Sequence, residues 1–142
     1  MTVTDQADVM EWDDPTQYVD ALSLMESQRQ QRWALRAMWD AKNRLAAVRD
    51  EEVTAEAVYQ SARRRAFFDP NCPVVVRGGV TTAERDAWVD QQVEDVETKW
   101  KLAKAATQAA KDHMDTLRAQ SVLISALAKT TQQIHAVAGV NR

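Results

Sequence analysis

The stretch FFDPNCPVVVRGGV, residues 67–80, holds two of the three prolines and two of the three glycines in the chain. Asp69 precedes Pro70, and a residue before proline is disfavoured in helical geometry. Gly78-Gly79 provides a sharp turn. Between them, Val74–Val76 is either a short strand or an extended segment. The stretch therefore predicts a hinge over residues 69–80 that separates two long helices.

The sequence before the hinge predicts one helix over about residues 15–68. Asp14 is a suitable N-cap, Pro15 suits the first helical position, and Gln17 can complete a capping box. The polar segment SQRQQR, residues 27–32, predicts a bend or a helix break. After it, apolar or small residues recur at the 3–4 spacing of a coiled-coil seam, with one exception, Glu52. The ten positions are Ala34, Met38, Ala41, Leu45, Val48, Glu52, Ala55, Tyr59, Ala62 and Ala66.

The sequence after the hinge predicts a second helix over about residues 82–138. Thr81 is suited to cap it, Glu84 lies three residues further on, and Gly139 offers a C-cap. Acidic residues crowd its first turns and none follows Asp115, which complements the helix dipole. Its apolar stripe comprises Val89, Val93, Val96, Trp100, Ala103, Ala106, Ala110, Leu117, Ile124, Leu127 and Ile134.

These features predict an all-α protein, with residues 14–142 as a single helical domain in which two long helices form an antiparallel, coiled-coil-like hairpin. Each unbroken helix would span about 75–85 Å at about 1.5 Å per residue. A hairpin of that length does not bury its stripes within one chain, so either the helices bend back into a bundle or several chains pack together. We expect a homo-oligomer. The residues predicted to form its seam are Met38, Leu45, Val48, Tyr59, Val96, Leu117, Ile124 and Leu127.

The charge distribution is uneven although the net charge is only −3. Residues 1–28 contain seven acidic residues and no Lys or Arg, whereas the rest of the chain is mildly basic. Residues 1–13 show no helical period and predict a flexible acidic tail, which would compete with DNA for the basic body, dock on a partner through Trp12, or remain solvated. No apolar run reaches the ~18 residues that span a bilayer. We expect a soluble cytoplasmic protein without membrane contact.

The residue types needed for catalysis or metal binding do not occur in the required patterns. Cys72 is the only cysteine, and its neighbours include no acid–base partner. His113 and His135 lack a second ligand at helical spacing. Gly78-Gly79 lacks the Lys-Ser/Thr that follows a phosphate-binding glycine loop. The sequence predicts no enzyme, no cofactor, no metal and no small-molecule substrate.

Two groups of arginines are candidates for binding phosphates. Arg63–Arg65 end the first helix, and Arg77 follows across the hinge, so together they would form a positive tip. Cations at a helix C-terminus also gain roughly 0.3–1 kcal/mol from the dipole, and this purely structural role stays open. Arg29, Arg32 and Arg36 are spaced to share one helix face.

Two tryptophans, Trp33 and Trp39, accompany this second group of arginines. Arginines interleaved with aromatic rings suit single-stranded nucleic acid, through phosphate contacts and base stacking. The alternative is that both tryptophans are core residues and that the arginine stems cover them. The core interpretation is favoured for Trp33.

The segments AVYQSARRRAFF, residues 57–68, and ERDAWVDQQVEDVETKWKLAKAATQAAKDHMDTLRAQSVLISALAK, residues 84–129, resemble the UvsY-type recombination mediators of phages. This resemblance in layout covers roughly residues 15–135. It implies a small helical oligomer that binds single-stranded DNA and helps to load a RecA-like recombinase, with Arg63–Arg65 as the DNA-binding cluster.

We therefore expect a non-enzymatic mediator that binds single-stranded DNA non-specifically and cooperates with a RecA-like recombinase or a single-strand-binding protein in the phage host. The alternative is a coiled-coil virion component, or an inhibitor of a host protein, that does not bind DNA.

Overall fold

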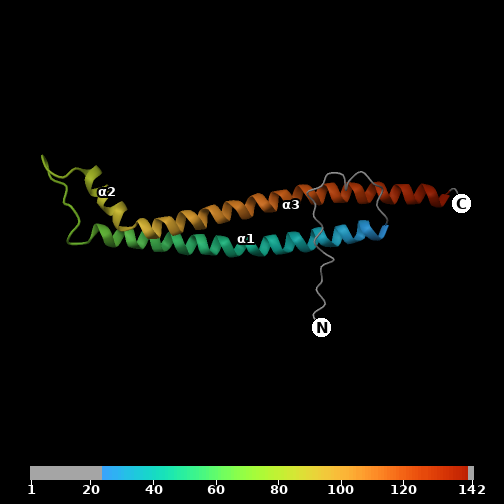
Figure 1. Cartoon of the computed structure of the whole chain (residues 1–142), viewed down its shortest axis with the longest axis horizontal. Helices are drawn as coiled ribbons and strands as arrows, with labels where there is room; N and C mark the ends of the chain where they lie inside the picture. Colours follow the sequence, from blue (N-terminus) through green and yellow to red (C-terminus); the bar gives the residue numbers. More distant parts are fainter. Residues whose placement is uncertain (1–23, 141–142) are drawn as a thin grey trace, which may run out of the picture. The chain divides into compact units, whose positions relative to one another are not determined.

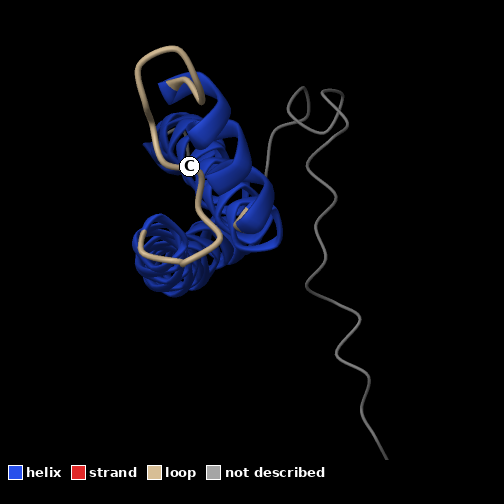
Figure 2. Ribbon diagram, turned by 90° about the vertical axis from the view of Figure 1, so that its left-hand side faces the viewer, coloured by secondary structure: helices blue, strands red, loops and turns tan. Residues whose placement is uncertain are grey.

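The computed structural model of the chain describes residues 24–140. In this part of the chain there are three helices and no strand: α1 (Leu24–Phe67), α2 (Thr82–Gln92) and α3 (Glu94–Val140) (Figure 1 and Figure 2). The long helices α1 and α3 pack antiparallel, and the short α2 lies between them in the sequence. The prediction of an all-α protein with two long antiparallel helices is confirmed.

The described residues divide into two compact units, each built from a part of α1 and a part of α3. Unit 1 contains residues 24–41 and 114–140, and unit 2 contains residues 42–113. The predicted acidic tail, residues 1–13, and the predicted helix start at Asp14 lie outside the described residues.

The hydrogen bonds of Asp69 and the proline at position 70 end α1 at the beginning of the hinge. The Asp69 N–H donates to the Ala66 carbonyl at 3.2 Å, a tighter turn than the α-helix makes. Pro70 has no N–H with which to continue the helix. The Asp69 Oδ1 atom then accepts a hydrogen bond from the Asn71 N–H at 2.8 Å, which fixes the first turn of the hinge.

The second half of the hinge depends on one glycine conformation. Gly78 has a φ of 83°, in the left-handed region that side chains disfavour. The Gly79 N–H donates to the Val76 carbonyl at 3.1 Å and closes the turn. Val74–Val76 are exposed and form no strand, so they are an extended segment of the hinge.

A capping box begins α2 at the residues that the sequence indicates. The Thr81 side chain accepts from the Glu84 N–H at 3.2 Å, and the Glu84 carboxylate accepts from the Thr81 N–H at 2.8 Å. Both donors would otherwise lack partners at the helix start.

The prediction of one continuous helix over residues 82–138 is wrong, because Val93 interrupts it and separates α2 from α3. Val93 has φ −109° and ψ 10°, outside helical geometry. Hydrogen bonds continue through the break, since its N–H donates to the Val89 carbonyl at 3.2 Å and its carbonyl accepts from the Glu97 N–H at 2.9 Å. Val89 and Val93 are 0% and 3% exposed and pack in one cluster, so the break lies at a buried position.

The core of unit 2 joins all three helices around Tyr59. Tyr59 and Ala66 of α1 are buried against Val89 and Val93. The Tyr59 ring stacks on Trp100 of α3 with centroids 5.1 Å apart. Burial of each large apolar side chain contributes about 1.5–3 kcal/mol, so this end of α1 is well anchored.

Farther along unit 2, a buried hydroxyl group connects the two long helices. Thr107 on α3 is 3% exposed, and its Oγ1 lies 3.3 Å from the Val48 carbonyl of α1 and 3.2 Å from the Ala103 carbonyl of its own helix. A single proton is thus shared between two acceptors, which satisfies the buried group.

The core of unit 1 is centred on Trp33. This half-buried ring packs against two clusters, one formed by Ala34 with Ile124 and the other by Ala41 with Met114 and Leu117. Small alanines on α1 therefore face larger side chains on α3, and Trp33 covers both contacts. The core interpretation of Trp33 agrees with this packing.

The predicted bend or break at residues 27–32 is wrong, because α1 is continuous there. Ser27 and Gln30 are each 5% exposed and continue the 3–4 spacing of the buried face toward the N-terminus. The Gln30 Oε1 atom has no hydrogen-bond partner among the described residues. Burial on the helix face has overridden the polar character of these residues.

The seam predicted on the first helix lies on the packed face of α1, since all ten positions are buried or half-buried. On α3 the stripe is partly misassigned. Ala106 and Ile134 are exposed, whereas Thr107, Met114 and Thr131 are buried in the 3–4 register. The eight residues predicted as an oligomer seam are all buried or half-buried within one chain. The oligomer seam therefore stays a prediction, since four of its residues, Met38, Leu45, Val96 and Leu127, are only half-buried.

Candidate functional site

The arginine triplet at the end of α1 does not form three equivalent charges. Arg63 donates from Nη1 to Asp90 Oδ1 at 2.7 Å and to the Tyr59 hydroxyl at 3.2 Å. Its guanidinium also lies over the Phe67 ring, 5.6 Å from the centroid. The hydrogen bond to Asp90, followed by that to Tyr59, raises the pKa of the Arg63 guanidinium. Arg63 therefore connects α1 to α2, and its role is structural.

The remaining arginines of the tip are exposed. Arg64 places its Nε 3.4 Å from the Gln60 carbonyl, a long hydrogen bond to its own helix. Arg65 and Arg77 are both exposed. Consecutive residues are about 100° apart around a helix, so Arg64 and Arg65 do not share a face. The tip offers separated charges to a ligand.

Acidic groups lie close to the tip on α2. Asp90 neutralises Arg63, and Asp86 accepts from Arg85 at 3.3 Å. The Arg85 guanidinium covers the Phe67 ring at 5.3 Å from the centroid. These carboxylates reduce the positive potential that a phosphate would meet beside Arg63.

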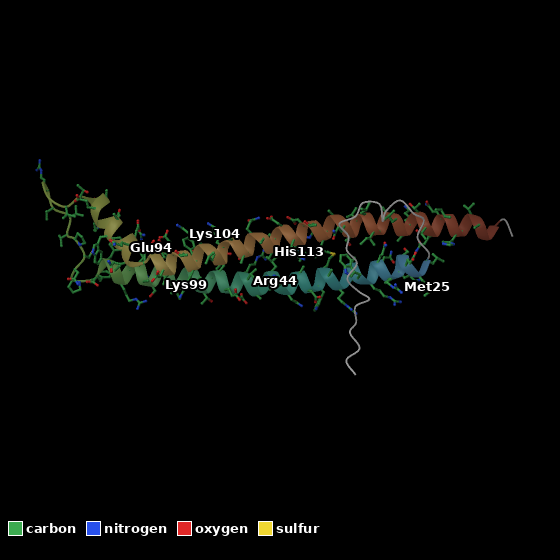
Figure 3. All side chains as sticks on the ribbon, in the orientation of Figure 1. Met25, Arg44, Glu94, Lys99, Lys104 and His113 are labelled. Atoms are coloured by element: carbon green, nitrogen blue, oxygen red, sulfur yellow. The ribbon has the colours of Figure 1, made fainter. Side chains whose placement is uncertain are left out.

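The second group of arginines lies on α1 in unit 1. Arg29, Arg32 and Arg36 are exposed and line one open hollow along the helix. Met25, labelled in Figure 3, lies near the start of α1 and lines the same hollow. The other lining residues are Gln28, Trp33, Ala37 and Asp40. Here the 3–4 spacing places three guanidinium groups on one face.

The two tryptophans near these arginines have different environments. Trp33 is half-buried in the core of unit 1. Trp39 is 63% exposed and lies three residues after Arg36, on the next turn of the same helix. An exposed indole next to a row of arginines is the arrangement that stacks on an unpaired base. The spacing in the sequence placed Trp39 beside the arginines but left its exposure open.

The lysines of α3 in unit 2 are partly engaged with their own helix. Lys101 pairs with Glu97 at 3.0 Å, and this hydrogen bond raises the pKa of the Lys101 ammonium. The Lys104 ammonium lies 5.6 Å from the Trp100 ring centroid. Figure 3 labels Lys99 and Lys104 on this part of α3. They form no row comparable to that on α1.

Neither a metal-binding cluster nor a membrane-spanning helix occurs among the described residues. Within residues 24–140, no group of three or more His, Cys, Asp or Glu side chains is arranged to hold a metal ion. His113 is exposed, and Cys72 is a half-buried free thiol packed against the Tyr59 cluster. No helix of this part of the chain is both long enough and apolar enough to cross a membrane.

Comparison of the chain with protein-family models, with curated proteins and with solved structures gave no match. The function must therefore be inferred from the chemistry of the exposed surfaces, among which the Arg29/Arg32/Arg36 face with Trp39 combines aligned charge and an exposed ring.

Proposed function

We propose that this protein is a non-enzymatic, self-associating protein that binds single-stranded DNA without sequence preference, in the manner of a phage recombination mediator. The observation that supports the proposal is the row of exposed arginines, Arg29, Arg32 and Arg36, on one face of α1 beside the exposed Trp39 ring. The tip residues Arg64, Arg65 and Arg77 would add weaker contacts.

The proposed contacts divide into two kinds. The three guanidinium groups would bind successive phosphates, and their release of counterions would supply most of the affinity. The Trp39 ring would stack on an unpaired base, which contributes about 1–3 kcal/mol and tolerates any base. Neither contact reads a base edge, so binding would depend on strandedness and on salt rather than on sequence.

Self-association would make these few contacts effective. Linking several weak sites converts later binding steps into intramolecular ones and raises the avidity for a long strand. Coiled-coil packing between chains would present repeated arginine rows to one strand. A strand held in this way, at cytoplasmic salt, would be the substrate on which a RecA-like recombinase displaces a single-strand-binding protein.

Fluorescence anisotropy of a labelled oligothymidine across a salt series tests the proposal. For single strands the slope of log K against log salt is about −0.7 per phosphate contact, so three contacts per chain predict a slope of about −2 or steeper. A duplex of the same length should bind more weakly, because its bases are not available to Trp39. The absence of binding at about 50 mM salt would refute the proposal.

A second candidate function is supported by the exposed apolar side chains, among them Leu35, Val53, Phe68 and Leu102. Large exposed apolar groups are typical of surfaces that bind other proteins. A coiled-coil interaction protein without DNA affinity would show protein binding and a flat response in the salt series.

A further inference from the structure

The face of α3 opposite its buried face carries a second 3–4 repeat in unit 1. The buried residues Leu117 and Ile124 pack against α1, and Ala128 is buried one turn after Ile124. On the other side of the helix, exposed and uncharged residues recur at 3–4 spacing from residue 116 to residue 137. These residues are Thr116, Ala119, Leu123, Ala126, Thr130, Gln133 and Val137.

This uncharged face is unusual for a helix surface in solvent. Leu123 and Val137 are 44% and 63% exposed, and no Lys, Arg, Asp or Glu occurs among its seven positions. Surface helices ordinarily place charged residues opposite the buried stripe. The exposed face of α1 in the same unit follows that rule, with Arg29, Arg32, Arg36 and Asp40. The surface of α3 opposite its buried stripe is therefore uncharged where the corresponding surface of α1 is charged.

We propose that residues 116–126 of this face bind the same residues of a second copy of the chain, antiparallel about a two-fold axis close to Val122. The inference rests on the self-association in the proposed function and is independent of DNA binding. A two-fold contact uses one patch twice, so the patch has to be complementary to itself when reversed. The order of residues along α3 meets that condition.

Side-chain size supports one antiparallel register. In an antiparallel pair of helices, the first position of each 3–4 repeat lies opposite the second position of a repeat on the other helix. If Ala119 lies opposite Leu123 of the second copy, then Thr116 lies opposite Ala126 of the second copy, and the reciprocal pairs follow by symmetry. Each layer places a small side chain against a larger one, which permits close packing.

The charges that flank the face select the antiparallel arrangement. Asp115 and Lys129 lie on one edge of it, with Val122 midway between them. In the proposed register, Asp115 lies beside Lys129 of the second copy, and this pair occurs twice. A parallel pairing in register would instead leave Asp115 about 21 Å along the axis from Lys129 of the second copy, so this pair would not form. The existing contact of Asp115 with Arg118, at 3.3 Å and exposed, is too weak to prevent a second partner.

The edge at Val122 provides a further apolar contact. Val122 is 71% exposed and borders a shallow hollow that it shares with Met38, Ser121 and Ser125. In the proposed register, the two Val122 side chains meet near the axis. Their burial would remove one of the most exposed apolar groups of unit 1 from water.

Sedimentation velocity of the full chain without DNA tests the surface. Ala119→Glu places a charge at the centre of the contact and should weaken self-association at least tenfold. Gln132→Glu is the matched control, because it introduces the same residue at an exposed position of α3 outside the face. Circular dichroism should show equal helicity for both variants. A wild-type chain that stays monomeric, or equal association of the two variants, would overturn the proposal.

Charge reversal tests the register. Asp115→Lys and Lys129→Asp should each weaken the dimer, and the double variant should recover most of the wild-type association. A double variant that associates no better than the single ones would contradict the antiparallel pairing.

Cross-linking tests the axis independently. With Cys72→Ser to remove the natural thiol, Val122→Cys should give a covalent dimer with a short bismaleimide, whereas Gln132→Cys should not. The reverse pattern would exclude an axis near residue 122. These outcomes do not involve DNA, so failure here leaves the arginine row to be judged by the salt series alone.

Discussion

The two arginine groups of α1 contain the same residue type in equal number, yet their structural roles differ. Arg29, Arg32 and Arg36 follow 3–4 spacing and line one hollow. Arg63–Arg65 are consecutive, and the first of them is bound to Asp90 and Tyr59. Spacing along a helix, together with acids on neighbouring elements, decides whether arginines form a surface for phosphates or a structural contact. A basic run in a sequence does not by itself indicate a binding site.

Neutralising each group in turn gives the largest expected difference. Replacement of Arg29, Arg32 and Arg36 by Gln should lower the affinity for single-stranded DNA about a hundredfold at low salt and make the salt slope shallower by about 2. The matched triple variant, Arg64, Arg65 and Arg77 to Gln, removes equal charge without breaking the Arg63 contacts. We expect it to lose less than about tenfold, as measured by anisotropy. Equal losses in the two variants would show that only total charge matters.

The tryptophans should separate binding from stability. Trp39→Ala should lower the affinity for single-stranded DNA by about 1–3 kcal/mol while the free energy of unfolding changes by less than about 0.5 kcal/mol, because the ring is exposed. Trp33→Ala should lower the free energy of unfolding by about 2–3 kcal/mol, since it packs against both clusters of unit 1. Urea denaturation and anisotropy on both variants provide the comparison. Loss of stability in the Trp39 variant would assign that ring to the core.

The smallest effect is expected within the tip itself. Arg63→Ala should lower the free energy of unfolding by about 1 kcal/mol, through loss of the Asp90 pair and of the contact with the Phe67 ring. Arg65→Ala, at an exposed neighbouring position, should change it by less than about 0.5 kcal/mol. Denaturation midpoints that coincide for the two variants would mean that the Arg63 contacts contribute nothing.

Local sequence signals predicted much of this fold. The 3–4 spacing from Ala34 to Ala66 identified the packed face of α1, and Thr81 with Glu84 identified the start of α2. The break at Val93 has no Gly or Pro to mark it, and Val93 itself is buried in the cluster that contains Tyr59. Tertiary packing keeps residues 27–32 helical despite their polar composition.

The candidate site was likewise predicted only where it depends on spacing within one helix. Helical spacing predicted that Arg29, Arg32 and Arg36 share a face, because that relation lies within one helix. The partner of Arg63 could not be read from the sequence, since Asp90 is on another helix and 27 positions away. The exposure of Trp39 likewise depends on where α3 lies against α1, which the spacing of α1 alone does not specify.

The division of the chain into two units has a consequence for the order in which contacts become favourable. The contacts of unit 2 connect residues on either side of the hinge that are close in the sequence, such as Tyr59 and Val89. Those of unit 1 join residues near opposite ends of the described chain, such as Ala34 and Ile124. Closing a longer loop costs more chain entropy. Once unit 2 has formed, the effective loop that the contacts of unit 1 must close is shorter. Forming those contacts then costs less chain entropy than it would in the unfolded chain.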